Sequence, residues 1–230
     1  MFRSILYFSC LTATLFSAPV ISAAQSQAAV NIFYVRHAES LGNVTHVHSS
    51  YNDNTLSEKG HQQTAALTRK LDVYHFDHIV VSPKHRALKT IMPYLKKHGL
   101  VAEIWPELDE CCWQKSRQSS SASRPGRGDR ISLDADMKPY FKFSHSEYEY
   151  KTRSYGAGIF QLFKATDLIK RRFAGSGKNI LMVGHYHAGS RIFELLQGLE
   201  PEGRYKLSNA KINHLQETGD GSFRVINFNQ

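Results

Sequence analysis

NIFYVRHAESLGN, Asn31 to Asn43, carries the strongest structural signal in this chain of 230 residues. Its first five residues, Asn31 to Val35, form an apolar, β-branched and aromatic run, which is typical of a strand buried on both faces. Polar residues follow immediately, so Arg36 and His37 should emerge at the carboxyl end of that strand, the edge of an open α/β sheet where ligands bind. A guanidinium beside an imidazole makes a site for an anion, and the imidazole can also act as a nucleophile.

Two more predicted strands end in the same way. His78 to Val81 is predicted as a strand, and the helix after it should have Pro83 and Arg86 in its first turn and stop at Gly99. A third strand, Val101 to Trp105, leads into three acidic residues, Glu107, Asp109 and Glu110. Three successive strand ends would therefore present two arginines, a histidine and a cluster of acids.

A second informative stretch is another buried run, Asn179 to Val183, which is followed closely by His185. A helix is expected from Arg191 to Leu196, and a helix N-terminus beside His185 would help to hold a phosphate. Residues 210–216 and 223–228 are predicted as edge strands of the same sheet.

The alternation of strands near residues 31, 78, 101 and 179 with helices predicts a three-layer α/β/α domain with a mainly parallel central sheet. One helix should begin after an N-cap at Ser57. A long helix should run from about Ser146 to Phe173, interrupted by Gly156 and Gly158. Residues 44–55 are predicted as a polar loop and residues 134–143 as an irregular segment.

The first 24 residues are predicted to be a secretory signal peptide. Arg3 gives a basic start, Ile5 to Phe16 is a short apolar run, and Ala23 and Ala24 suit a cleavage site. An uncleaved anchor is the alternative, but the run is shorter than the roughly 20 residues that span a bilayer. We therefore expect a single domain over residues 25–230 with no transmembrane span, either secreted or periplasmic.

The formal net charge of +9 favours anionic partners. Nucleic acid is the least expected of these, because the chain has no helix-turn-helix, zinc-finger or RRM pattern. Residues 115–130, KSRQSSSASRPGRGDR, have almost no apolar side chains and are predicted as an exposed insertion. Two interpretations of this insertion remain open: its arginines gather an anionic substrate over the site, or the segment is simply solvated.

Cysteine usage argues against a disulfide framework. Signal cleavage would remove Cys10 and leave only the neighbours Cys111 and Cys112. Neighbouring cysteines can form only a vicinal disulfide, so an ordinary core must hold the fold together. A redox-active pair and a soft-metal site are alternatives, but two small buried residues beside a site are the favoured interpretation.

Five sequence blocks, in order, resemble those of the histidine phosphatase (phosphoglycerate mutase-like) superfamily. The family patterns are R-H-G-x-x-x-x-N, L-[ST]-x-x-G, S-P-x-x-R-A-x-x-T, L-x-E, and V-[SG]-H before a helix that ends L-x-G. In this chain they correspond to Arg36–Asn43, Leu56–Gly60, Ser82–Thr90, Leu108–Glu110, and Val183–His185 with Gly198. Any one block is weakly specific, but five in order over about residues 31–200 are strongly so.

The resemblance implies a phosphatase that needs neither metal nor cofactor, in which His37 becomes phosphorylated and Glu110 is the general acid. The residues that it places around the phosphate are Arg36, Arg86, His185 and Asn43. Such donors suit the equatorial oxygens of a phosphoryl group in transfer, and cationic neighbours should keep His37 neutral. The expected substrate is a small phosphorylated molecule or a phosphorylated component of the cell envelope.

Some residues depart from the family pattern. Ala38 replaces the usual glycine after the first histidine, a small change. Tyr186 and His187 stand where small residues often follow the second histidine, so we expect a bulkier wall there that contacts the substrate. His187 also competes with His185 for the second histidine role, and His185 is preferred because it directly follows the strand.

Alternatives stay open for the acid and for the function class. Glu107 and Asp109 compete with Glu110 as the general acid. A phosphomutase is less favoured than a phosphatase, because an exported enzyme would lack a cytosolic diphosphorylated primer. The other two classes are a non-catalytic phosphate- or polyanion-binding module and a metal-dependent hydrolase, the latter built on His46, His48, His185 and His187.

Overall fold

The computed structural model describes residues 28–112, 131–144 and 154–230. These residues form a seven-stranded sheet in the order β4-β3-β2-β5-β1-β6-β7. The strands are β1 (Asn31–Arg36), β2 (His78–Val81), β3 (Ala102–Ile104), β4 (Phe141–Phe143), β5 (Asn179–Gly184), β6 (Ile212–Glu217) and β7 (Phe223–Asn227). The helices are α1 (Leu41–Thr45), α2 (Ser50–Asn54), α3 (Glu58–Leu71), α4 (His85–His98), α5 (Tyr155–Phe173) and α6 (Tyr186–Leu196), with short 3₁₀ turns η1 (Pro106–Leu108) and η2 (Lys138–Tyr140).

Parallel pairing dominates the sheet, as expected. β1 and β2 each pair in parallel with the central strand β5, and β3 continues the parallel pairing from β2 to β4. Among the described strands, the two antiparallel pairs are β1 with β6 and β6 with β7. The expectation that both tail segments are edge strands is wrong for β6, because the chain turns back after β6 and places β7 outside it.

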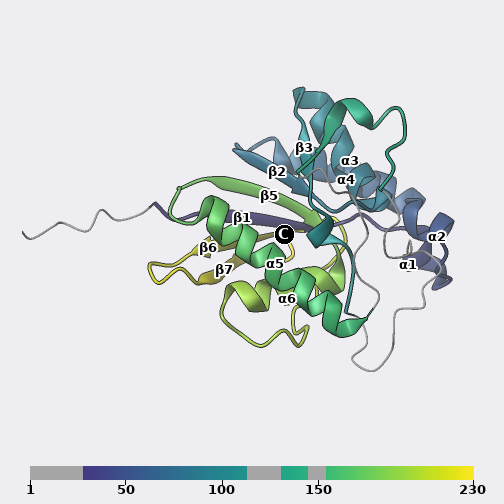
Figure 1. The fold of residues 1–230 in the computed structure, drawn as a ribbon. Helices are drawn as coiled ribbons and strands as arrows, with labels where there is room; N and C mark the ends of the chain where they lie inside the picture. The colour runs from purple at the N-terminus through teal and green to yellow at the C-terminus, as the bar shows by residue number, and fades with distance from the viewer. Residues whose placement is uncertain (1–27, 113–130, 145–153) are drawn as a thin grey trace, which may run out of the picture.

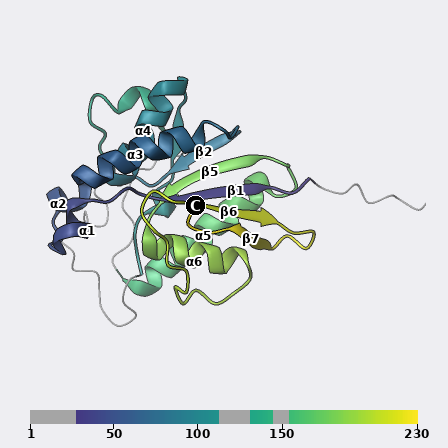
Figure 2. The same cartoon turned by 180° about the vertical axis from the view of Figure 1, so that it is seen from behind.

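Apolar residues alternate between the two faces of the sheet, and this alternation builds the three predicted layers. On β1, Phe33 and Val35 face the core under α3 and α4, while Ile32 and Tyr34 face the core under α5 and α6. Each large aliphatic side chain buried in these cores contributes about 1.5–3 kcal/mol to stability. Figure 1 shows α5 and α6 lying over one face, and Figure 2 shows the molecule from behind.

Two predicted helix ends are confirmed. Ser57 accepts a hydrogen bond from the backbone N–H of Gly60 at the start of α3. Gly60 is required there because a Cβ would lie 2.1 Å from the carbonyl oxygen of Glu39. The second confirmed end is the C-terminus of α4. Gly99 caps this helix with φ +64°, a left-handed conformation that glycine adopts without strain.

Other boundaries differ from the prediction. Pro83 lies before α4 rather than in its first turn, since the N-cap is Lys84. Helix α6 begins five residues earlier than expected, at Tyr186, because strand β5 leads into it through a single extended residue, His185. The predicted loop 44–55 contains α2 and the end of α1. These short helices begin at serine N-caps, Ser40 for α1 and Ser49 for α2, and have no apolar periodicity that would predict them.

Further corrections concern the segments around α5. β4 lies inside residues 134–143, which were expected to be irregular, and three residues are too few to show a period of two. Gly156 and Gly158 lie within the first turns of α5 and do not interrupt it. The predicted signal peptide, the whole predicted insertion and the predicted helix start at Ser146 lie outside the described residues. In the described ranges, no helix is long and apolar enough to cross a membrane.

Candidate active site

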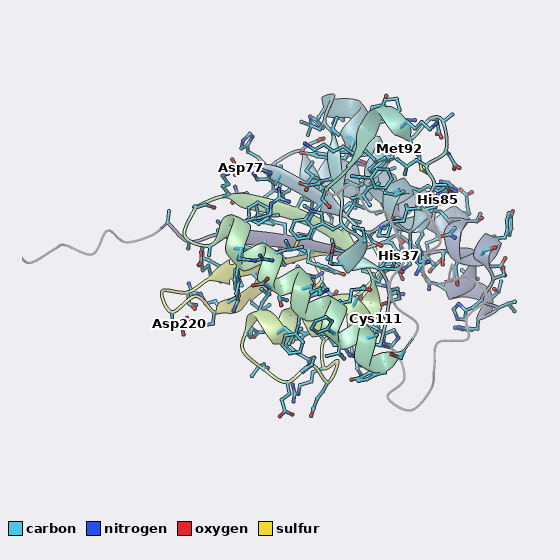
Figure 3. The ribbon with its side chains drawn as sticks, viewed as in Figure 1. His37, Asp77, His85, Met92, Cys111 and Asp220 are labelled. Carbon is cyan, nitrogen blue, oxygen red and sulfur yellow. A yellow bond between two sulfur atoms is a disulfide. The ribbon has the colours of Figure 1, made fainter. Side chains whose placement is uncertain are left out.

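His37 directly follows strand β1, and the backbone holds it in place. Its N–H continues the sheet pairing by donating to the carbonyl oxygen of Gly184 on β5 at 2.9 Å. The next residue, Ala38, donates its N–H to Oγ1 of Thr90 on α4 at 2.8 Å. The His37 side chain is buried, with 3% of its surface exposed. In Figure 3 it lies toward the end of the sheet where α1 and α2 are found, whereas Asp77 and Asp220 lie at the opposite end.

Arg86 fixes the tautomer of His37. Its Nε lies 3.1 Å from Nε2 of His37, and because a guanidinium only donates, Nε2 must accept. The proton of the neutral ring is therefore on Nδ1, which donates to the carbonyl oxygen of Ala38 at 2.7 Å. The lone pair of Nε2 thus points at the arginine side chain that is expected to bind a phosphoryl oxygen.

The electrostatic surroundings keep His37 neutral. Burial, followed by the positive charges of Arg86 and Arg36, lowers the pKa of His37 well below its usual value, against the opposing effect of the Ala38 hydrogen bond. A neutral imidazole retains a nucleophilic lone pair. The expectation that cationic neighbours keep this histidine neutral is confirmed, with burial as the larger cause.

His185 occupies the N-cap of α6, beside His37. The two rings lie 5.3 Å apart between centroids. Nε2 of His185 shares a hydrogen bond of 2.6 Å with the hydroxyl of Ser82, at the end of β2. The Tyr34 hydroxyl donates to the His185 carbonyl oxygen at 2.9 Å and accepts its N–H at 2.7 Å. A Cβ at Gly184 would lie 2.3 Å from that hydroxyl, so the tyrosine requires glycine there.

Arg36 crosses from β1 toward the start of α6. It donates to the carbonyl oxygen of Leu207 at 3.0 Å, and its guanidinium carbon lies 5.1 Å from the centre of the Tyr186 ring. Among the described residues, its buried Nε has no hydrogen-bond partner. Burial lowers the pKa of Arg36, and the Glu110 carboxylate opposes that shift. The Tyr186 ring therefore lies beside Arg36, and its expected contact with a substrate stays a prediction.

Glu110 reaches the N-terminus of α6 from the segment after η1. Its carboxylate accepts the backbone N–H of Ala188 at 2.9 Å and that of His187 at 3.4 Å. An acid at a helix N-terminus is stabilised by the unpaired N–H groups there. The side chain of Gln161 on α5 fixes the segment before Glu110 by donating to the carbonyl oxygens of Glu107 and Asp109.

Asn43 has a structural partner that the sequence did not reveal. Its Oδ1 accepts the backbone N–H of Ser40 at 3.2 Å and the side-chain amide of Asn209 at 3.3 Å. Asn209 also donates to the carbonyl oxygen of His37 at 2.7 Å. A phosphate contact by Asn43 would therefore use its amide nitrogen, a donor.

The histidines of the metal alternative do not assemble. The side chain of His48 pairs with Asp53 at 2.8 Å, and His46 is an exposed residue that caps α1. Residues 28–112, 131–144 and 154–230 contain no group of three or more histidine, cysteine or acidic side chains that could hold a metal ion.

Cys111 and Cys112 are joined by a disulfide next to Glu110. The favoured interpretation, two small buried residues beside a site, predicted the burial of both cysteines correctly but did not predict the disulfide. Gly158 on α5 packs against the pair, and a Cβ there would lie 2.5 Å from Sγ of Cys112. Figure 3 shows Cys111 near the same end of the molecule as His37.

Three residues with structural roles at the site were not identified from the sequence. The sequence does contain a signal for Tyr34, because a tyrosine hydroxyl in a buried strand needs a hydrogen-bond partner. Ser82 begins the Ser82–Thr90 block, but its hydrogen bond to His185 depends on the pairing of β2 with β5. Asn209 had no signal, because it lies in an irregular segment far along the chain from Asn43.

The chain resembles known proteins in sequence and in fold. The family model of the histidine phosphatase superfamily (branch 1) matches residues 32–230. An alpha-ribazole phosphatase from Shigella flexneri is 18% identical with a TM-score of 0.64, and the alignment covers 87% of this chain and 96% of that one.

Two further solved structures share the fold at similar identity. A mycobacterial glucosyl-3-phosphoglycerate phosphatase is 18% identical with a TM-score of 0.60, over 87% of this chain and 99% of that one. A phosphoserine phosphatase mutant from Entamoeba histolytica, in complex with phosphoserine, is 19% identical with a TM-score of 0.56, over 87% and 97%. At these identities the solved structures show a common fold.

Proposed function

The chain belongs to the histidine phosphatase superfamily (branch 1), and on that premise we propose that it hydrolyses phosphate monoesters through a phosphohistidine on His37. The observation that carries the proposal is the contact between Nε2 of His37 and Nε of Arg86, at 3.1 Å. A neutral nucleophile faces a cation that can bind the group to be transferred. The named relatives act on phosphorylated small molecules, which supports the same substrate class here.

The first chemical step forms a bond between Nε2 of His37 and phosphorus and breaks the bond between phosphorus and the ester oxygen. The Arg86 N–H that Nε2 accepts turns to a phosphoryl oxygen in this step, which frees the Nε2 lone pair to attack. Arg36, Arg86 and His185 stabilise the negative charge on the three equatorial oxygens. Glu110, which the proposal takes to be protonated when the anionic substrate lies beside it, gives its proton to the departing oxygen, so the alcohol leaves neutral. The phosphoryl group is now held on His37 as a covalent intermediate.

The second step releases phosphate. A water molecule attacks phosphorus in line with the bond to His37, and Glu110, now a carboxylate, takes the proton of that water. The bond between phosphorus and Nε2 breaks, which restores the neutral imidazole. The carbonyl oxygen of Ala38 holds the proton on Nδ1 throughout, so Nε2 is the reacting nitrogen in both steps.

Glu110 is the preferred acid among the three candidates because of its position. It accepts backbone hydrogen bonds at the start of α6, the helix that His185 caps. Asp109 instead belongs to a buried ion pair, since its Oδ1 lies 3.8 Å from Nζ of Lys84 and also accepts the N–H of Glu110 at 2.7 Å. Glu107 belongs to the 3₁₀ turn that precedes them.

Export is part of the proposal and rests on the sequence of residues 1–24. A cleaved signal peptide would place the enzyme in the periplasm or outside the cell, where small phosphorylated molecules and phosphorylated envelope components are available. Fractionation of cells expressing the full chain, with N-terminal sequencing of the product, tests this part. A mature N-terminus near residue 24 or 25 supports export, and an intact N-terminus in the cytosol contradicts it.

The activity is tested by hydrolysis of para-nitrophenyl phosphate in excess chelator, with wild-type protein beside His37→Ala. Activity that survives the chelator and is lost in the variant supports the proposal. Loss of wild-type activity in the chelator supports the metal-dependent alternative. Absence of turnover together with binding of inorganic phosphate supports the binding module.

A further inference from the structure

Lys84 occupies a position that is locally unfavourable for a lysine. It is the N-cap of α4, where no side-chain cap hydrogen bond forms, although serine, threonine, aspartate and asparagine are preferred there. A positive charge at a helix N-terminus is disfavoured by the helix dipole. The residue is also buried, with 3% of its surface exposed, and burying an ammonium group is costly unless it is paired.

Asp109 is one residue that compensates the charge of Lys84. Lys84 Nζ lies 3.8 Å from Oδ1 of Asp109, and the Asp109 side chain is 9% exposed. A buried ion pair is a weak source of stability, because desolvation of both charges offsets their attraction. A contribution to stability therefore does not explain why this ion pair is buried here. The location of the pair in the fold offers a better explanation.

The pair joins the two segments that carry the proposed phosphate-binding and acid groups. Lys84 lies two residues before Arg86, and its backbone N–H donates to the Ser82 hydroxyl that bonds His185. On the other side, the oxygen of Asp109 that faces Lys84 also accepts the backbone N–H of Glu110 at 2.7 Å. A line of contacts thus runs from the start of α4 to the backbone of the proposed acid.

We propose that Lys84 and Asp109 are positioning residues for Glu110. The inference rests on the proposed function, because it assumes that Glu110 is the general acid. The pair fixes the Glu110 backbone relative to Arg86 and His37, while the Glu110 side chain turns about this fixed point between the N-terminus of α6 and the departing oxygen. Loss of the pair would misplace the acid and leave the phosphate-binding groups intact.

Dependence on the leaving group separates positioning of the acid from a general structural role. The departing oxygen of para-nitrophenyl phosphate needs little protonation, whereas that of beta-glycerophosphate needs a proton. The parameter to compare is kcat/KM, since it covers the steps up to transfer of the phosphoryl group to His37. Glu110→Gln should lower kcat/KM for beta-glycerophosphate by about 10²–10⁴-fold, and much less for para-nitrophenyl phosphate.

Lys84→Met keeps an unbranched side chain in the buried space and removes the charge. We expect it to lower kcat/KM for beta-glycerophosphate by about 10–100-fold, a part of the general-acid effect, and to change kcat/KM for para-nitrophenyl phosphate by less than about threefold. Asp109→Asn keeps an oxygen for the Glu110 N–H and should cause a smaller loss of the same kind. It also provides a test if Lys84→Met does not fold. The control is Lys97→Met, which removes an exposed ion pair with Asp72 and should change neither value.

The double variant Lys84→Met/Asp109→Asn completes the test. Residues that act as one unit give non-additive effects, so the double variant should lose no more activity on beta-glycerophosphate than the worse single variant. Additive losses, or an equal fall for both substrates in step with the melting temperature, would overturn the inference and leave the proposed function standing. If Glu110→Gln itself shows no leaving-group dependence, the general-acid role fails, and the inference fails with it.

Discussion

Arg86 donates a hydrogen bond from Nε to Nε2 of His37 across 3.1 Å, so the proposed phosphate-binding cation and the proposed nucleophile are in direct contact. The contact depends on two different strand ends, because His37 follows β1 and Arg86 lies in the first turn of α4, after β2. The strand between them in the sheet, β5, brings His185 to the same edge. The positions of the three side chains follow from the order of the strands.

Replacement of Arg86 by methionine should slow the enzyme strongly. The variant loses a donor to the phosphoryl oxygens, and loss of one such donor costs about 10²–10³-fold in rate. Steady-state kinetics with para-nitrophenyl phosphate measure this effect. Arg171→Met is the matched control, since Arg171 forms an exposed ion pair with Asp167, and it should retain wild-type activity. Equal activity of the two variants would contradict the assignment of Arg86.

His37 should stay neutral in mildly acidic solution. Its pKa is lowered well below the usual value in the folded protein, so His37 should take up a proton only at a lower pH than an ordinary histidine, which titrates at about pH 6.5. NMR of the imidazole signals, assigned with His37→Gln, measures this directly. A titration of His37 centred near pH 6.5 would contradict the buried, cation-flanked environment.

The same lowered pKa has a consequence for stability. The unfolded chain binds a proton at His37 below its ordinary pKa, and the folded protein binds that proton only at lower pH. The free energy of unfolding should therefore fall as the pH drops below about 6.5. Urea unfolding across this range should show a shallower fall for His37→Gln than for wild type, and parallel curves for the two proteins would contradict the linkage.

Tyr34→Phe should destabilise the protein through the backbone of His185. The hydroxyl both donates to and accepts from that residue, so its loss leaves a buried N–H and a buried carbonyl without that partner. We expect a cost of about 1–3 kcal/mol in the free energy of unfolding. Tyr51→Phe is the matched control, because Tyr51 is 69% exposed, and it should unfold with wild-type stability. Indistinguishable unfolding of the two variants would argue against the role given to Tyr34.

Two glycines on α5 should respond in opposite ways to alanine. A Cβ at Gly158 meets Sγ of Cys112 at 2.5 Å, and the disulfide prevents that sulfur from turning away. Gly158→Ala should therefore cost about 1–3 kcal/mol by overpacking. A Cβ at Gly156 meets nothing within 4 Å, so Gly156→Ala should be neutral or stabilising by up to about 1 kcal/mol. Thermal unfolding in non-reducing buffer compares them, and equal effects would be inconsistent with the packing of α5 on the cysteine pair.

The parts of the fold that could be predicted from the sequence are those with local causes. The runs behind Arg36 and His185 are apolar because strands in the middle of a parallel sheet are covered on both faces. Ser57 and Gly99 mark helix ends through their own hydrogen bonding and backbone conformation. The motifs proposed to be catalytic follow strand ends, so predicting the strands also predicted which side chains share an edge.

The parts that could not be predicted depend on contacts between distant residues. β4 is a strand only because β3 pairs with it, and three residues carry no periodic signal of their own. Asn209 joins Asn43 through the return of the chain before β6. Lys84 is an ordinary surface residue type in the sequence, and its burial against Asp109 is visible only once α4 and η1 are placed together.

The most direct test of the account is to trap the phosphorylated enzyme. Wild-type protein and His37→Gln are mixed with para-nitrophenyl phosphate in excess chelator, quenched in alkali, in which phosphohistidine survives, and examined by intact and peptide mass spectrometry. The account predicts one added phosphoryl group on the wild-type peptide that contains His37, and none on the variant. Turnover by wild-type protein with no phosphorylated enzyme, or with the phosphoryl group on another residue, would contradict it.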